Sequence, residues 1–301
     1  MNWFLLALVR PLLYAVVNTA NKILISRKIS PLTYQIAYYA AGIPALLAIP
    51  LLLPIKTDTT IISILAVFGV LEAIVSYMWY YSMKNEEASR VVSLVYTLPV
   101  FTAILSAIFL GEALALHVYA GIGLLTISAL AASYRHSESR KKNRNGRVSK
   151  VLPIMIVRNI IWGGYLVYTK SIIGVFEPAS VIFWTLGSGT AALLAMLLVP
   201  SILQTFRREM HGTPHSWTAV VVLMSTLEVI IAFATYEAFK LASASVVISI
   251  SAIQPIILIF VLVGFTRFFP HLLKEEFDRR TLALKAAAAV LIFAGTWLVM
   301  G

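Results

Sequence analysis

The chain has 301 residues, of which 60% are apolar and only 12% are charged, and its mean hydropathy is +0.88. Soluble domains carry about 25% charged residues, so this composition argues against a soluble enzyme, a disordered chain and a nucleic-acid-binding protein. The absence of cysteine excludes disulfides and thiolate metal sites.

Ten apolar stretches are long enough to cross a bilayer as helices, which takes about 20 residues each. In chain order they cover Trp3–Ile25, Leu32–Leu53, Thr60–Met83, Arg90–Leu110, Ala115–Tyr134, Val151–Ile173, Ala179–Pro200, Ser216–Lys240, Ala244–Thr266 and Thr281–Met300. Polar connections such as MKNEEAS and REMHGTPHS separate them. The sequence therefore predicts an all-α, multi-pass membrane protein with ten transmembrane helices.

The net charge of +11 comes from lysines and arginines that are unevenly distributed over these connections. Of the 24, two fall inside spans and 19 lie in or beside alternate connections, which leaves three for the opposite side: Lys56, Lys170 and Lys240. Basic loops are retained in the cytoplasm, so residues 135–150 are predicted to be a cytoplasmic linker. Both termini are then expected outside, and the plasma membrane is the expected location.

The two halves of the chain resemble each other, which predicts a first repeat of residues 1–134 and a second of residues 151–301. Leu71–Pro99 aligns without gaps on Leu227–Pro255 with ten of 29 positions identical, and VRPLLYAVVNTANK aligns on VRNIIWGGYLVYTK. Because each unit has an odd number of spans, the two are expected to be inverted. Secondary transporters bind substrate near the midplane between such repeats, and alternate between two open faces.

Four ionisable residues lie well inside predicted spans: Arg10, Glu72, Arg158 and Glu228. Each costs roughly 2.5–3.5 kcal/mol to insert, so each needs a reason. Two of each sign balance, and we predict that they face a shared substrate cavity. Burial favours a protonated acid whereas a nearby arginine favours the carboxylate. Proton coupling is therefore one interpretation, and structural pairing of glutamate with arginine between helices is the other.

Further polar residues lie on the same helix faces as these four ionisable residues, because residues four apart in a helix share a face. The additional candidates for substrate or proton binding are Asn18, Tyr80, Lys170 and Tyr236. For Lys170, snorkelling to the membrane interface is the alternative. Polar faces of membrane helices contact protein or water rather than lipid, so these residues extend the predicted cavity into a path.

Two prolines, Pro99 and Pro255, occupy matching places in paired spans. Proline kinks a helix, so these residues are predicted either to bend as gates or to form static kinks for packing. Small residues in Gly121–Ala132 and Ala286–Gly295 allow close helix packing, and a homodimer is one use of such a face.

The segment ASRVVSLVYTLPVFTAILSAIFLGEALALHVYAGIGLL resembles the EamA domain of the drug/metabolite transporter superfamily. The matching features are Ala88-Ser89, Pro99, Gly111-Glu112 and Gly121. The resemblance implies a ten-helix permease of two five-span domains that carries metabolites, amino acids or drugs. The second half lacks the Gly-Glu pair. Many members of the family have both termini in the cytoplasm, opposite to the topology that the charges here indicate.

These features predict a secondary active transporter, without a cofactor, that moves a small polar metabolite across the bilayer. Groups of both signs favour an amino acid or a related zwitterionic or drug-like compound. The alternative is an antiporter of sugar phosphates or nucleotide sugars held by Arg10, Arg158 and Lys170. A channel or an intramembrane enzyme is less favoured, because the histidines and aspartates lie in connections or in the first turn of a span and no metal site or phosphate loop is recognisable.

Overall fold

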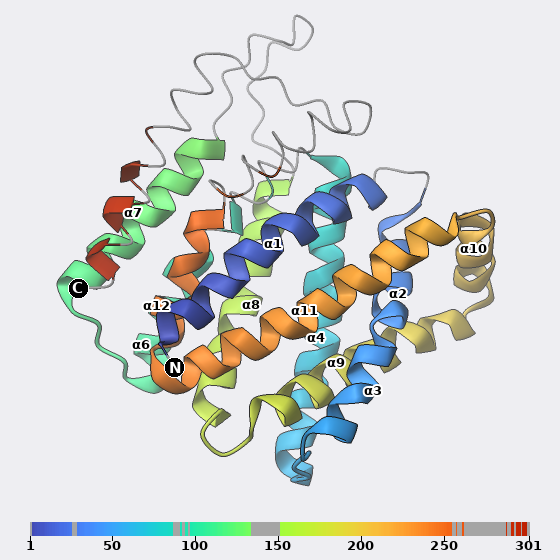
Figure 1. Cartoon of the computed structure of the whole chain (residues 1–301), viewed down its shortest axis with the longest axis horizontal. Helices are drawn as coiled ribbons and strands as arrows, with labels where there is room; N and C mark the ends of the chain where they lie inside the picture. Colours follow the sequence, from blue (N-terminus) through green and yellow to red (C-terminus); the bar gives the residue numbers. More distant parts are fainter. Residues whose placement is uncertain are drawn as a thin grey trace, which may run out of the picture.

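The computed structural model describes residues 2–25, 29–86, 97–133 and 151–254, and, outside these ranges, residues 91, 94, 95, 257, 261, 287, 290, 291, 293–295 and 297–299. All regular structure in this part of the chain is helical (Figure 1). The elements are α1 (Trp3–Ile25), α2 (Pro31–Ala41), α3 (Ile43–Leu52), α4 (Thr59–Asn85), α6 (Leu98–Leu110), α7 (Leu116–Ser133), α8 (Val151–Ile172), α9 (Pro178–Ala195), η1 (Met196–Leu198), α10 (Pro200–Met210), α11 (His215–Leu241), α12 (Ala244–Ser249) and η2 (Ile250–Ile253).

Six helical segments of the described chain are long and apolar enough to cross a membrane. Four of them are the single helices α1, α4, α8 and α11. The other two are α2 joined to α3, and α9 joined to η1. The six segments coincide with predicted spans one to three and six to eight. The shorter apolar helices α6 and α7 fall within spans four and five, and α12 begins span nine. The all-α membrane protein is thus confirmed, whereas the count of ten and the division into two repeats stay predictions.

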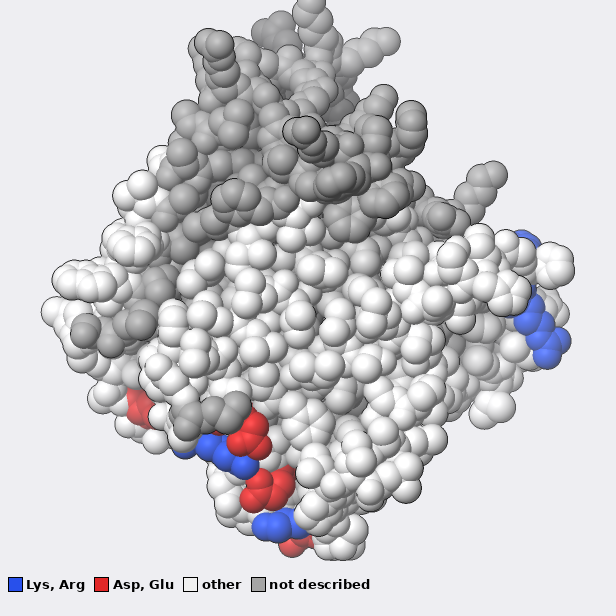
Figure 2. All heavy atoms as spheres, viewed as in Figure 1, with Lys and Arg blue, Asp and Glu red and all other residues white. Residues whose placement is uncertain are grey.

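The described surface of the protein fits a membrane environment. On the face shown in Figure 2, charged side chains lie at the right and lower edges, and the surface between them is uncharged. Large apolar side chains such as Leu51, Phe109 and Trp297 are exposed by 69–84%. A soluble domain would not present such a surface to water, so the chain is an integral membrane protein.

Two local features differ from the predicted elements. The second span is interrupted at Gly42, because Pro44 in the first turn of α3 has no N–H to continue the helix. A surface helix, α10, lies where a connection was expected. Its apolar residues Ile202, Phe206 and Met210 recur every four residues and pack on a buried cluster, while its polar face is exposed.

Helices from the two halves of the chain pack on each other. α1 contacts α11, α4 contacts both α8 and α9, and α11 contacts α2. In Figure 1, α1 starts at the lower side and α8 starts at the upper side, so the aligned helices run in opposite senses. The closest approach is between α4 and α9, where Gly69 meets Gly189 with no room for a side chain.

Two lysines bind the C-terminal ends of the two longest described helices. Lys22, near the end of α1, donates from Nζ to two carbonyl oxygens at the end of α4, and Lys170, near the end of α8, does the same at the end of α11. The acceptors are Met83 and Glu86 (2.7 Å) for Lys22, and Phe239 and Ala242 (2.9 Å) for Lys170. Helix C-termini carry unpaired carbonyls that attract positive charge. All three pairs of partners are equivalent in the repeat alignment, which is what an inverted repeat predicts.

Candidate functional site

A cavity of about 820 Å³, its open mouth included, lies among α1, α4, α6, α8, α11 and the segment from α12 to residue 254. All four ionisable residues predicted to share a cavity line it: Arg10, Glu72, Arg158 and Glu228. Asn18, Tyr80 and Pro99 line it as well. The prediction that these four residues share a cavity, which was based on the free-energy cost of a charge in an apolar span, agrees with this lining.

A second cavity of about 480 Å³ continues from the first. The two share five lining residues, Arg10, Tyr14, Glu72, Trp162 and Glu228. We call the larger cavity the first arm and the smaller one the second arm. Both arms therefore meet at the charged groups.

Three of the residues found only in the first arm have partners in the second arm that are aligned in the repeat. The first arm contains Asn18, Ser76 and Tyr80, and the second contains their aligned partners Leu166, Ala232 and Tyr236. The first set lies toward the C-terminal ends of α1 and α4, and the second toward those of α8 and α11. Each arm thus follows the C-terminal halves of the helices of one repeat, as an inverted repeat predicts.

The arginines are held against aromatic rings. The Arg10 guanidinium carbon lies 5.0 Å from the ring centre of Tyr14, and that of Arg158 lies 5.4 Å and 5.8 Å from those of Trp79 and Trp162. Such contacts contribute about 2 kcal/mol when desolvated. They fix each cation in the wall of the cavity and leave its polar edge available.

A hydrogen-bond chain also orients Arg158. Its Nη1 donates to Asn159 Oδ1 at 2.9 Å, and the Asn159 amide donates in turn to the Leu94 carbonyl and the Thr97 hydroxyl, both at 2.8 Å. Asn159 is fully buried. The guanidinium is therefore positioned by groups on α8 and on the segment that leads into α6.

No ion pair joins Glu72 or Glu228 to either arginine in the part of the chain that the structure describes. The ion pairs there connect Lys240 to Glu177 at 2.7 Å and to Glu237 at 3.1 Å. The four charges are therefore not joined directly in the described residues, and their role stays a prediction.

Comparison with known proteins identifies a domain in the first part of the chain. The model of the EamA-like transporter family matches residues 1–134. These residues form an EamA-like transporter domain. The family places the domain in the drug/metabolite transporter superfamily, as the sequence resemblance implied. No curated protein matches the chain.

The fold itself extends beyond the EamA-like domain. A solved structure described as "Crystal structure of protein" is similar to 98% of this chain and 95% of its own chain, with a TM-score of 0.70 and 16% sequence identity. At that identity the likeness concerns the fold alone.

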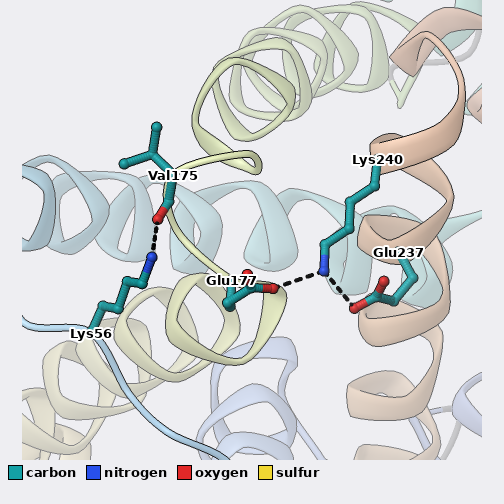
Figure 3. Close-up of polar contacts among 5 residues, drawn as sticks. All are labelled: Lys56, Val175, Glu177, Glu237 and Lys240. Atoms are coloured by element: carbon teal, nitrogen blue, oxygen red, sulfur yellow. Dashed lines mark hydrogen bonds and ion pairs between the residues drawn. The ribbon is translucent and has the colours of Figure 1, made fainter.

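Two tyrosines that line the second arm contact each other: the hydroxyl oxygens of Tyr165 and Tyr236 are hydrogen-bonded at 2.7 Å. At the end of α11, Lys240 reaches Glu177 in the turn before α9, and Lys56 Nζ donates to the Val175 carbonyl at 2.7 Å (Figure 3). The hydrogen bond from Lys240 lowers the pKa of the Glu177 carboxyl.

Not every predicted site residue reaches the cavity. Tyr236 lines only the second arm, and Lys170 lines neither arm because its ammonium group binds the end of α11. Pro99 lies in the first turn of α6, where a proline is readily accommodated. Pro255 and the linker 135–150 lie outside the described residues.

The sequence reading missed several lining residues. They are Trp162 and two isolated polar residues in the apolar run ISAIQP, Ser251 and Gln254. Their polarity within a predicted span was the available signal. The small residues proposed for a dimer face meet partly within the chain, since Gly121 lies against Gly295; the homodimer stays a prediction.

Proposed function

We propose that this protein is a secondary active transporter that carries a small zwitterion, an amino acid or a related compound, by alternating access. The observation that supports it is the set of four charges, two of each sign, around one cavity without ion pairs between them. Buried charges require partners. A ligand with one ammonium and one carboxylate group supplies partners of both signs and leaves the net charge of the site unchanged.

The arrangement favours a zwitterion over the anionic alternative. A sugar phosphate brings about 1.5–2 negative charges next to Glu72 and Glu228. The third cation invoked for it, Lys170, is engaged with backbone carbonyls instead. Two arginines facing two glutamates then leave no excess of positive charge for such a substrate.

The two arms support alternating access. They share Arg10, Glu72 and Glu228, and several of the residues that line only one arm are equivalent in the repeat alignment. We propose that the structure corresponds to a state in which the second arm is closed toward the face of Lys56, Lys170 and Lys240. In the reverse state the second arm opens and the first closes. The proposal keeps that face outside, the linker cytoplasmic and the plasma membrane as the location.

Counterflow in proteoliposomes tests this function. Vesicles preloaded with each unlabelled amino acid are expected to accumulate the matching radiolabelled one, with saturation, while protein-free vesicles do not. Sugar phosphate exchange that amino acids fail to inhibit would instead support the anion antiporter, and unsaturable flux would indicate a channel. Imposed proton gradients then show whether a proton accompanies the substrate.

A further inference from the structure

Four buried hydrogen-bond donors without partners belong to residues that line the first arm. They are Arg158 Nε, Trp162 Nε1, Ser251 Oγ and Gln254 Nε2. An unpaired buried donor forfeits the hydrogen bonds that water gave it, so four at one place need a common explanation. All four can donate to the same kind of group, one rich in lone pairs.

The backbone fixes where these donors lie. Arg158 and Trp162 are one turn apart on α8. Ser251 and Gln254 are one turn apart where α12 gives way to the tighter helix η2, and their side chains are only 7% and 5% exposed.

The lining of the arm is apolar at the positions equivalent to Ser251 and Gln254. Val95 and Leu98 align with Ser251 and Gln254 in the repeat, and they line the same cavity. The four charged residues are therefore conserved between the two repeats, whereas Ser251 and Gln254 are replaced by apolar residues in the first repeat. A ligand that fits both has a polar acceptor group at one end and an apolar part at the other.

We propose that Arg158, Trp162, Ser251 and Gln254 form the carboxylate subsite of the transporter, with Glu72 and Glu228 as the partners of the ammonium group. A carboxylate has two oxygens that accept about four hydrogen bonds, which matches the four donors. Val95 and Leu98 then face the apolar side chain of the substrate. This inference rests on the proposed function, because it names which part of the zwitterion each group holds.

Three probes that share one aromatic ring test the subsite on the purified, full-length protein. Benzoate carries the carboxylate, benzamide is its neutral counterpart, and phenylphosphonate carries a different anion; binding is measured by calorimetry. We expect benzoate to bind at least tenfold more tightly than benzamide. Equal affinity of benzoate and benzamide would overturn the subsite, since the donors would then serve only water, and preference for phenylphosphonate would overturn the carboxylate assignment.

Two substitutions remove a donor while conserving shape, Trp162→Phe and Gln254→Met. Each is expected to weaken benzoate binding about tenfold and to leave benzamide binding unchanged. The matched control is Trp217→Phe, because Trp217 Nε1 is also buried without a partner but does not line the cavity. If a variant does not fold, the relative affinities of the unaltered protein for the three probes decide whether the subsite binds a carboxylate.

The two proposals fail separately. Amino acid counterflow with benzoate binding that is insensitive to both substitutions would overturn the subsite and leave the transport function standing. Benzoate binding that depends on both residues, without counterflow of any amino acid, would overturn the transport function and leave the subsite standing.

Discussion

Tyr165 of α8 and Tyr236 of α11, which line the second arm, share a hydrogen bond between hydroxyl oxygens 2.7 Å apart. A neutral hydrogen bond contributes about 0.5–1.5 kcal/mol. We therefore expect Tyr165→Phe to raise the ratio of open to closed second arm roughly two- to twelvefold. Thiol labelling at Ala232→Cys, in the second arm, measures this ratio. Tyr168→Phe, on the same helix but outside the pair, is the control and is expected to change nothing.

The arms themselves can be probed at equivalent positions, since the chain has no cysteine of its own. Ser76 and Ala232 are small, aligned in the repeat and line different arms. We expect a membrane-impermeant thiol reagent to reach Ser76→Cys from one side and Ala232→Cys from the other. Substrate is expected to change the two labelling rates in opposite directions. Labelling of both from the same side would contradict alternating access.

Removing either central carboxylate is expected to impair transport without preventing insertion. Glu72→Gln or Glu228→Gln replaces a charge-assisted contact worth about 1.5–3 kcal/mol, so the KM of counterflow should rise roughly 10- to 150-fold. Asp58→Asn is the matched control: it removes a carboxylate from the N-terminus of α4, outside the cavity, and asparagine caps a helix as well. Normal transport by both glutamine variants would end the assignment of these residues.

Acidification is expected to loosen the closed second arm through Glu177. The hydrogen bond from Lys240 holds the pKa of this carboxyl below its ordinary value of 4.5, so its stabilisation is complete above about pH 4.5 and is lost as pH falls through the lower value. The side chain is 51% exposed, which limits the effect to about 1 kcal/mol. Labelling of Ala232→Cys, normalised to the exposed Ser171→Cys, should rise less than about fivefold, and Glu177→Gln should abolish the rise.

The contact between α4 and α9 depends on Gly69. A Cβ atom there would lie 2.0 Å from Ser188 Oγ and 2.3 Å from the Thr185 carbonyl oxygen. Gly69→Ala is therefore expected to separate the helices and to cost about 1–3 kcal/mol. Gly187→Ala on α9 is the control, since its nearest neighbour would be 3.9 Å away. Thermal unfolding in detergent compares the two.

Much of the fold was predictable because the constraint of the membrane is simple. A helix needs a fixed length of apolar residues, and the predicted first span has the same ends as α1. The convergence of Arg10, Glu72, Arg158 and Glu228 was predictable for the same reason, since an apolar span excludes charges that lack a common polar space.

Other features depend on three-dimensional contacts that no local pattern encodes. The residue type and helix face of Lys170 are those expected of a residue that binds substrate. In the structure, however, its ammonium group donates to carbonyl oxygens at the end of α11. Ser251 and Gln254 carry no charge, so their cost in an apolar span is small and their signal weak. The helix α10 was hidden by its charged face, although the spacing of Ile202, Phe206 and Met210 was present in the sequence.

The balance of two arginines and two glutamates around the cavity has an energetic consequence for the membrane. A zwitterion moved through a neutral site transfers no net charge, so the membrane potential does no work on that step. Each proton that travels with it would transfer one charge, worth about 2.3 kcal/mol per 100 mV. With the proposed zwitterionic substrate, the voltage sensitivity of transport is therefore expected to follow the protonation of the two central glutamates.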